Sequence, residues 1–152
     1  VANVGNFGSS NRVDYTALGE NINLASRMEG LNKFLGTDLL ITGNLFSRVN
    51  GKFVTRYCGR FQLKGFERDV EVHELLAATG QAESFRALRE TFTEALARFE
   101  KKDFEAAEDG FHRALKLNPE DGPSTFFLKH IAELRAHPPE GEWTGAVELK
   151  EK

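Results

Sequence analysis

The sequence of 152 residues has a single cysteine, Cys58, no long apolar run and no excess of basic charge. One cysteine cannot close an internal disulfide and forms no Cys-x-x-Cys pair, which is typical of a reducing cytoplasmic compartment. No apolar segment approaches the roughly 20 residues that cross a bilayer, so we expect no membrane contact by this segment. The formal net charge of −3 argues against a nucleic-acid partner, because phosphate binding needs a concentrated basic face.

The amino-acid composition of the chain indicates a packed hydrophobic core. Forty per cent of its residues are hydrophobic and thirteen are phenylalanine, which excludes a disordered tail. The start, Val1-Ala2-Asn3, is not a signal peptide and reads as if entered within a strand. We therefore interpret the chain as a fragment of a longer protein, called the parent below. Whether an upstream segment attaches that parent to the inner membrane stays open.

Residues 1–78 have the pattern of a mixed α+β unit. The spacing of Ile22, Ala25, Met28 and Leu31 predicts a helix that Gly36 ends. Strands are predicted at 39–41, 53–57, 61–63 and 70–75, with a hairpin-like link at 64–67.

Residues 79–137 have helical patterns instead. Apolar side chains recur at three or four positions over 84–101 and again over 104–115, and Asn118-Pro119 ends the second helix. Pro123 suits the first turn of a third helix. Residues 138–152 form a tail that opens with the stiff Pro138-Pro139 pair and ends with a short Val147/Leu149 alternation.

The segment 4–31 carries the chemical signal. Asn23 and Arg27 lie one helical turn apart and project from one face. An amide and a guanidinium there could hold phosphate oxygens and a sugar hydroxyl. On spacing alone, a surface arginine and a capping asparagine is the commoner explanation.

Three runs in this segment resemble the signature of class III adenylate/guanylate cyclases. They are Asn6-Phe7-Gly8-Ser9, Asp14-Tyr15-Thr16-Ala17-Leu18-Gly19 and Asn23-Leu24-Ala25-Ser26-Arg27-Met28. Residues 61–75 also resemble the closing hairpin of such domains. The resemblance implies that residues 1–78 are the C-terminal part of a cyclase catalytic domain, whose fold derives from the ferredoxin-like type.

The resemblance implies an adenylate cyclase activity in the parent, which converts ATP to 3′,5′-cyclic AMP and pyrophosphate. In the family the helix asparagine orients the ribose, and the helix arginine stabilises the phosphorus under attack. These roles fall on Asn23 and Arg27, which we take as catalytic. Thr16 falls on the purine-reading position, and Lys64 is the candidate for the phosphate-binding lysine, although a turn lysine is as often merely solvated.

The family's magnesium or manganese ions are held by two aspartates that precede the stretch present here. Asp14 is no substitute, because its motif position belongs to the strand before Thr16. We therefore expect no metal on this fragment and no turnover by it alone. The four histidines are scattered without ligand spacing.

The helical segment resembles one tetratricopeptide repeat with a capping helix. A helical hairpin packed on the cyclase part is the simpler interpretation, because a solenoid needs several repeats. Two functions stay open: a part of an adenylate cyclase that forms a homodimer through the cyclase domain, or a non-catalytic interaction module that acts through the helical repeat or the dimer surface. Strands missing from the sheet would leave edges that recruit a second copy.

Overall fold

The computed structural model describes residues 26–49, 52–63, 67–78, 80 and 82–148. The described part has an α+β fold, as the sequence predicts, with a four-stranded sheet and helices before and after it. Helical residues 26–35 come first and end before Gly36, whose φ of 65° lies in the left-handed region that glycine tolerates. This confirms the predicted end of that helix.

The sheet contains β1 (Leu40–Thr42), β2 (Phe53–Gln62), β3 (Val70–Ala78) and β4 (Val147–Glu148), in the order β1-β3-β2-β4. Strand β3 pairs antiparallel with both β1 and β2, and β4 pairs in parallel with the end of β2. The predicted strands at 53–57 and 61–63 are one continuous strand. The strand continues through an irregularity in register between Tyr57 and Gly59.

The helices after the sheet follow the predicted pattern closely. They are α3 (Ala82–Glu100), α4 (Phe104–Leu117) and α5 (Gly122–Ala136). Asp103 and Asp121 cap α4 and α5, each accepting a hydrogen bond from a backbone N–H of the first turn. The short α2 (Gly43–Val49) was not predicted from the sequence.

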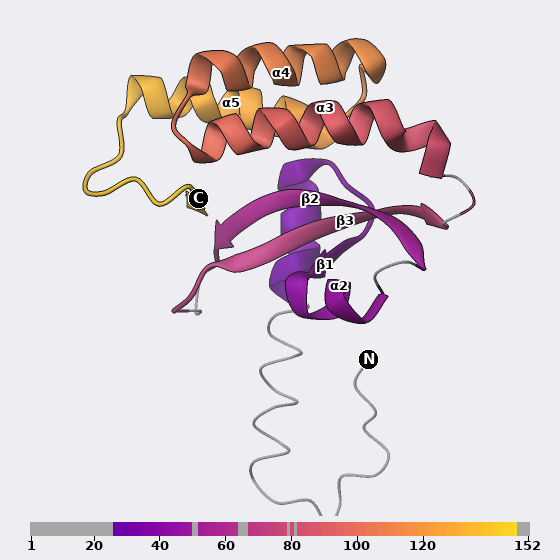
Figure 1. The fold of residues 1–152 in the computed structure, drawn as a ribbon. Coiled ribbons are helices and arrows are strands. Elements are labelled where there is room, and N and C mark those ends of the chain that lie inside the picture. The colour runs from indigo at the N-terminus through magenta and orange to yellow at the C-terminus, as the bar shows by residue number, and fades with distance from the viewer. Residues whose placement is uncertain (1–25, 50–51, 64–66, 79, 81, 149–152) are drawn as a thin grey trace, which may run out of the picture.

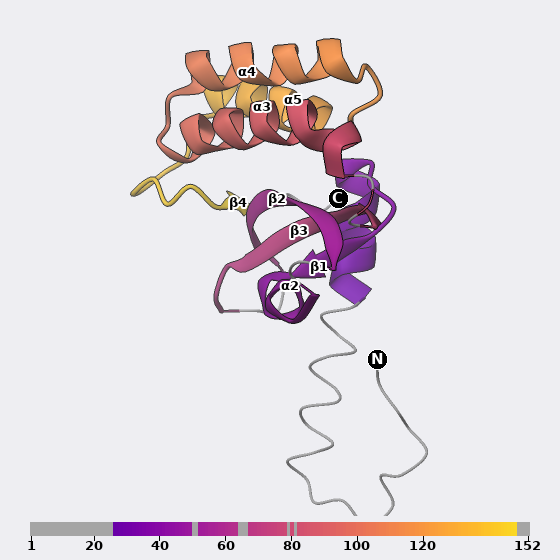
Figure 2. The ribbon, with the colours of Figure 1, turned by 45° about the vertical axis from the view of Figure 1, so that its right-hand side comes forward.

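The helices α3, α4 and α5 form a helical layer over the sheet, in which α3 and α5 lie next to the sheet and α4 packs on their far side (Figures 1 and 2). Five fully buried phenylalanines join the two layers, and their rings contact one another: Phe61, Phe92, Phe99, Phe111 and Phe127. Phe61 comes from the sheet, and the other four come from the helices. The part before residue 78 and the helices after it therefore share one hydrophobic core.

The chain returns to the sheet after α5. Trp143 packs on Phe99 and donates a hydrogen bond from Nε1 to the backbone oxygen of Glu100, at 2.8 Å. Val147, which is 1% exposed, then pairs with Phe61 through β4. Residues 143–148 thus fasten the end of the helical layer to the edge of the sheet.

Candidate functional site

Of the four predicted site residues, only Arg27 lies in the described part of the chain. Its side chain is on the exposed side of helical residues 26–35. Met28, Leu31 and Leu35 point into the core from the same helix and are 6%, 2% and 0% exposed. The predicted apolar stripe is therefore confirmed at Met28 and Leu31, and Arg27 lies beside that stripe on the exposed part of the helix.

Thr16, Asn23 and Lys64 lie outside the described residues, as do the motif runs before residue 26. Their predicted roles stay predictions. Within the described ranges, no group of three or more His, Cys, Asp and Glu side chains is placed to hold a metal ion. In the same part of the chain, no helix is long and apolar enough to span a membrane.

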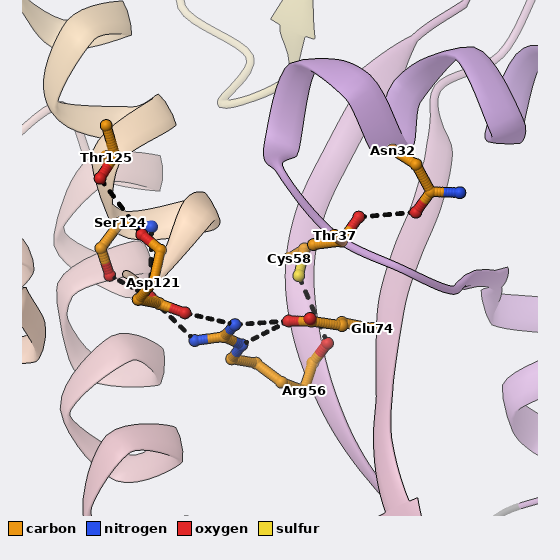
Figure 3. A network of polar contacts seen from close by, with 8 residues as sticks. All are labelled: Asn32, Thr37, Arg56, Cys58, Glu74, Asp121, Ser124 and Thr125. Carbon is orange, nitrogen blue, oxygen red and sulfur yellow. Dashed lines mark hydrogen bonds and ion pairs between the residues drawn. The ribbon is translucent and has the colours of Figure 1, made fainter. Parts of the chain in front are cut away.

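A buried ionic network links the sheet to the helical layer, and sequence reasoning missed it. The guanidinium of Arg56 on β2 donates to both carboxylate oxygens of Asp121, with Nη1 to Oδ2 at 3.1 Å and Nη2 to Oδ1 at 2.8 Å. It also donates to the Glu74 carboxylate on the neighbouring strand, with Nε to Oε1 at 3.1 Å and a second bond from Nη2. Figure 3 shows Arg56 between the two carboxylates.

Burial sets the electrostatics of this network. The side chains of Arg56, Asp121 and Glu74 are 1%, 4% and 13% exposed. Burial alone would lower the pKa of Arg56, but the hydrogen bond to Asp121 and the charge of Glu74 raise the pKa above its ordinary value. Burial also raises the pKa of Glu74, which the nearby Arg56 partly offsets. The guanidinium is therefore a permanent charge that needs both carboxylates.

Asp121 has a second role at the start of α5. Its Oδ2 accepts hydrogen bonds from the backbone N–H of Ser124 at 3.3 Å and from the Ser124 hydroxyl at 2.5 Å (Figure 3). One carboxylate thus caps α5 and anchors that helix to β2. Arg56 also lies over the ring of Phe92 on α3, 4.6 Å from its centroid. A single arginine therefore contacts two helices and a neighbouring strand.

Sequence signals for this network existed but were incomplete. Arg56 and Glu74 carry opposite charges inside predicted strands, and Asp121 precedes the Pro123 helix start at a capping distance. The pairing of residues 56 and 121, however, depends on how the helical layer sits on the sheet. Neither strand alternation nor helix periodicity contains that information.

Comparison with known proteins gives three similar relatives, all named adenylate cyclase. Adenylate cyclase 1 of Rhizobium meliloti (strain 1021) is 35% identical over 76 residues, which is 50% of this chain and 11% of the relative. The adenylate cyclase of Anabaena cylindrica is 31% identical over 77 residues, covering 49% of this chain and 15% of the relative. No family model and no solved structure matches the chain.

The third relative extends the similarity into the helical layer. The terminal-differentiation specific adenylate cyclase of Dictyostelium discoideum is 27% identical over 137 residues, covering 86% of this chain and 6% of the relative. Residues 1–78 are only about half of the chain, so this alignment includes a large part of the helices that follow. The chain spans a small fraction of each relative, and its similarity is to proteins that carry a cyclase name.

Proposed function

We propose that this chain is part of an adenylate cyclase and supplies the residues that stabilise the transition state. The cyclase-type motif of residues 6–28 carries the proposal, and the three relatives named adenylate cyclase support it. Arg27 stands on the exposed side of a helix whose other side is locked into the core. Such a rigid support suits a group that must be positioned before the reaction begins.

The proposed reaction is an intramolecular phosphoryl transfer. The ribose 3′-hydroxyl of ATP loses its proton to solvent as its oxygen forms a bond to the α-phosphorus. The bond from that phosphorus to the bridging oxygen of the β-phosphate breaks, and pyrophosphate leaves with the electron pair. Arg27 balances the charge that grows on the phosphorus oxygens, and Asn23 orients the ribose. Thr16 contacts the purine, and Lys64 binds the leaving phosphates.

The described residues contain no group of three or more His, Cys, Asp and Glu side chains that could hold the metal ions of the proposed enzyme. We therefore assign no step of the reaction to a metal held by this part of the chain. In the proposed enzyme, residues of the parent outside this part of the chain bind the metal ions.

A non-catalytic interaction module is the rival function. It would need an apolar helical surface that a partner can reach. Phe92, Phe111 and Phe127 of α3, α4 and α5 are all fully buried inside the molecule. Because these helices use their aromatic side chains on one another and on the sheet, the structure favours a fixed part of a larger domain over a recruiting surface.

Binding of a non-hydrolysable ATP analogue, α,β-methylene-ATP, separates the two functions. We expect calorimetry to detect binding to the 152-residue chain and Lys64→Ala to weaken it by about tenfold, the effect of one charge-assisted phosphate contact. The matched control, Lys33→Ala, changes an exposed lysine, and this variant should bind the analogue as tightly as the unchanged 152-residue chain does. No binding, or equal loss in both variants, would favour the interaction module.

A further inference from the structure

A cleft lies between α3 and the sheet. Its volume is about 790 Å³, and residues of α2, β2, β3 and α3 line it. Helix α3 lies over β2 on one side of this cleft (Figure 1). Arg27, the described residue of the proposed nucleotide site, is not part of the lining. The cleft is therefore a second candidate site with chemistry of its own.

Aromatic side chains form one wall of the cleft. Phe46 on α2 and Tyr57 on β2 are both half-buried, so each keeps an exposed part. The buried ring of His73 contacts both: it stacks on Phe46 with centroids 4.1 Å apart, and its centroid is 5.3 Å from that of Tyr57. Aromatic faces attract cations as well as apolar groups. The wall therefore suits a ligand that has an apolar body and a positive charge.

The ionic groups around the cleft carry more negative than positive charge. Three arginines in or beside the lining are each paired with two carboxylates. The three sets are Arg56 with Glu74 and Asp121, Arg86 with Glu83 and Glu90, and Arg60 with Asp69 and Glu100. One positive and two negative charges leave each set with a formal charge of −1. These arginines are therefore already neutralised, and the surplus charge repels an anion.

The charges that remain in the lining do not reverse this sign. Arg89 and Glu94 cancel formally, and Glu94 is exposed on α3 without a hydrogen bond or ion pair to any other described residue. Beside the aromatic wall, the Tyr57 hydroxyl donates to the Glu100 carboxylate at 3.0 Å. Burial, and after it the charge of Glu100, raises the pKa of Tyr57 above its ordinary value. The electric field at the wall thus favours positive charge.

We propose that this cleft binds a small organic ammonium ion with an apolar body. The ammonium group donates hydrogen bonds to the Glu94 carboxylate, and the apolar body packs against Phe46 and Tyr57. A neutral molecule of the same shape keeps the packing and loses the attraction to the carboxylates and ring faces. An anion meets the surplus negative charge and is excluded.

Calorimetric titration of the 152-residue chain with 2-phenylethylammonium tests this site, because that probe carries one ammonium group on an aromatic body. At fixed ionic strength we expect saturable one-to-one binding. The uncharged analogue 2-phenylethanol and the anion 3-phenylpropionate should each bind at least about tenfold more weakly.

Two variants assign the contacts. Glu94→Gln keeps the shape of the side chain without its charge and should weaken binding about fivefold, as loss of a partly exposed ion pair does. Its matched control is Glu133→Gln, at an exposed glutamate of α5 outside the lining. Phe46→Leu removes a ring and should weaken binding about threefold. Its control is Phe53→Leu, at a phenylalanine that is 40% exposed and also outside the lining.

Circular dichroism verifies that all four variants keep the helical fold. Both controls should bind 2-phenylethylammonium as tightly as the unchanged chain does. Absence of saturable binding would overturn the proposal, as would equal binding of 2-phenylethanol, or losses in the Glu94 and Phe46 variants no larger than in their controls. None of these outcomes bears on ATP-analogue binding, so this inference fails or stands separately from the cyclase proposal.

Discussion

At the residue scale, Arg56 is the side chain on which most of the interlayer contact depends. Its place in the run Phe53–Tyr57 predicts a strand but not its partner, because Asp121 is 65 residues away. The charge of an arginine suggests an exposed position, yet 1% of the side chain is exposed. The sequence therefore predicted the element correctly and could not predict the long-range pairing that makes burial of the charge tolerable.

Arg56→Met should destabilise the chain strongly. The substitution keeps the apolar stem but leaves the buried carboxylates of Asp121 and Glu74 without their counter-charge, which typically costs about 3–5 kcal/mol. Urea unfolding followed by circular dichroism measures the loss. Arg68→Met, at an exposed arginine of the β2–β3 connection, is the matched control. An effect under about 1 kcal/mol at Arg56, or one as large at Arg68, would contradict the assigned role.

The buried histidines predict a loss of stability in acid. Burial lowers the pKa of both His73 and His130 in the folded chain. Below the ordinary histidine pKa of about 6.5, the unfolded chain takes up protons that these side chains resist in the fold, so stability falls as the pH falls. The urea midpoint should therefore be lower at pH 5.5 than at pH 7.5. The raised pKa of Glu74 opposes this loss and is common to all the variants compared.

His130→Phe isolates one of these groups. His130→Phe should reduce the difference between the urea midpoints measured at pH 5.5 and pH 7.5. His112→Gln, at an exposed histidine, should leave that difference unchanged. If His130→Phe left the difference between the two urea midpoints unchanged, burial of His130 would not be a cause of the stability loss in acid.

At the element scale, periodicity predicted the long helices well, and of the short elements the strand predicted at 39–41 was found as β1 while α2 and β4 were not predicted. The helices α3, α4 and α5 repeat an apolar stripe over several turns, so their signal is strong. Helix α2 has only seven residues and β4 only two, too few for a period to emerge. The Val147/Leu149 alternation was noted in the tail without a strand being predicted. The parallel pairing of Val147 with Phe61 follows from the return of the chain after α5, which no local pattern encodes.

Gly110 sets the distance between α3 and α4. A Cβ at this position would stand 2.6 Å from the Cβ of Ala95, closer than real side chains approach. Gly110→Val should therefore push α4 away from α3 and lower stability by roughly 1–3 kcal/mol, as overpacking does. Thermal unfolding compares it with Gly80→Val, where a Cβ would meet nothing within 4 Å. Equal stability of Gly110→Val and the unchanged chain would contradict the close helix contact.

At the scale of the whole molecule, the sheet and the helical layer form one unit. The shared phenylalanine core, the Arg56 network and the strap of residues 143–148 all cross between them. The two sequence patterns on either side of residue 78 describe local structure. The interpretation of the helices as a hairpin packed on the preceding part anticipated contact between them, but not which residues make it. The candidate nucleotide site was recognised from the sequence motifs, and of its four predicted site residues only Arg27 lies in the described part of the chain.

Association of the chain stays a prediction. The cyclase resemblance implies a homodimer, and strands outside this chain would leave edges able to pair with another copy. The helical layer over the sheet covers one surface that a partner could otherwise use. Light scattering across a dilution series should give a dimer or a larger mass at high concentration, and a monomer mass throughout would contradict the expectation.

The cyclase proposal rests most directly on Arg27. In the parent that carries this chain, steady-state formation of cyclic AMP from ATP should show that Arg27→Ala lowers kcat by about 10²–10³, because its contact is made chiefly in the transition state. The KM for ATP should change little, and Arg48→Ala, at another exposed helical arginine, should retain both constants. A change in KM alone would reassign Arg27 to ground-state binding, and unchanged kinetics would contradict the account.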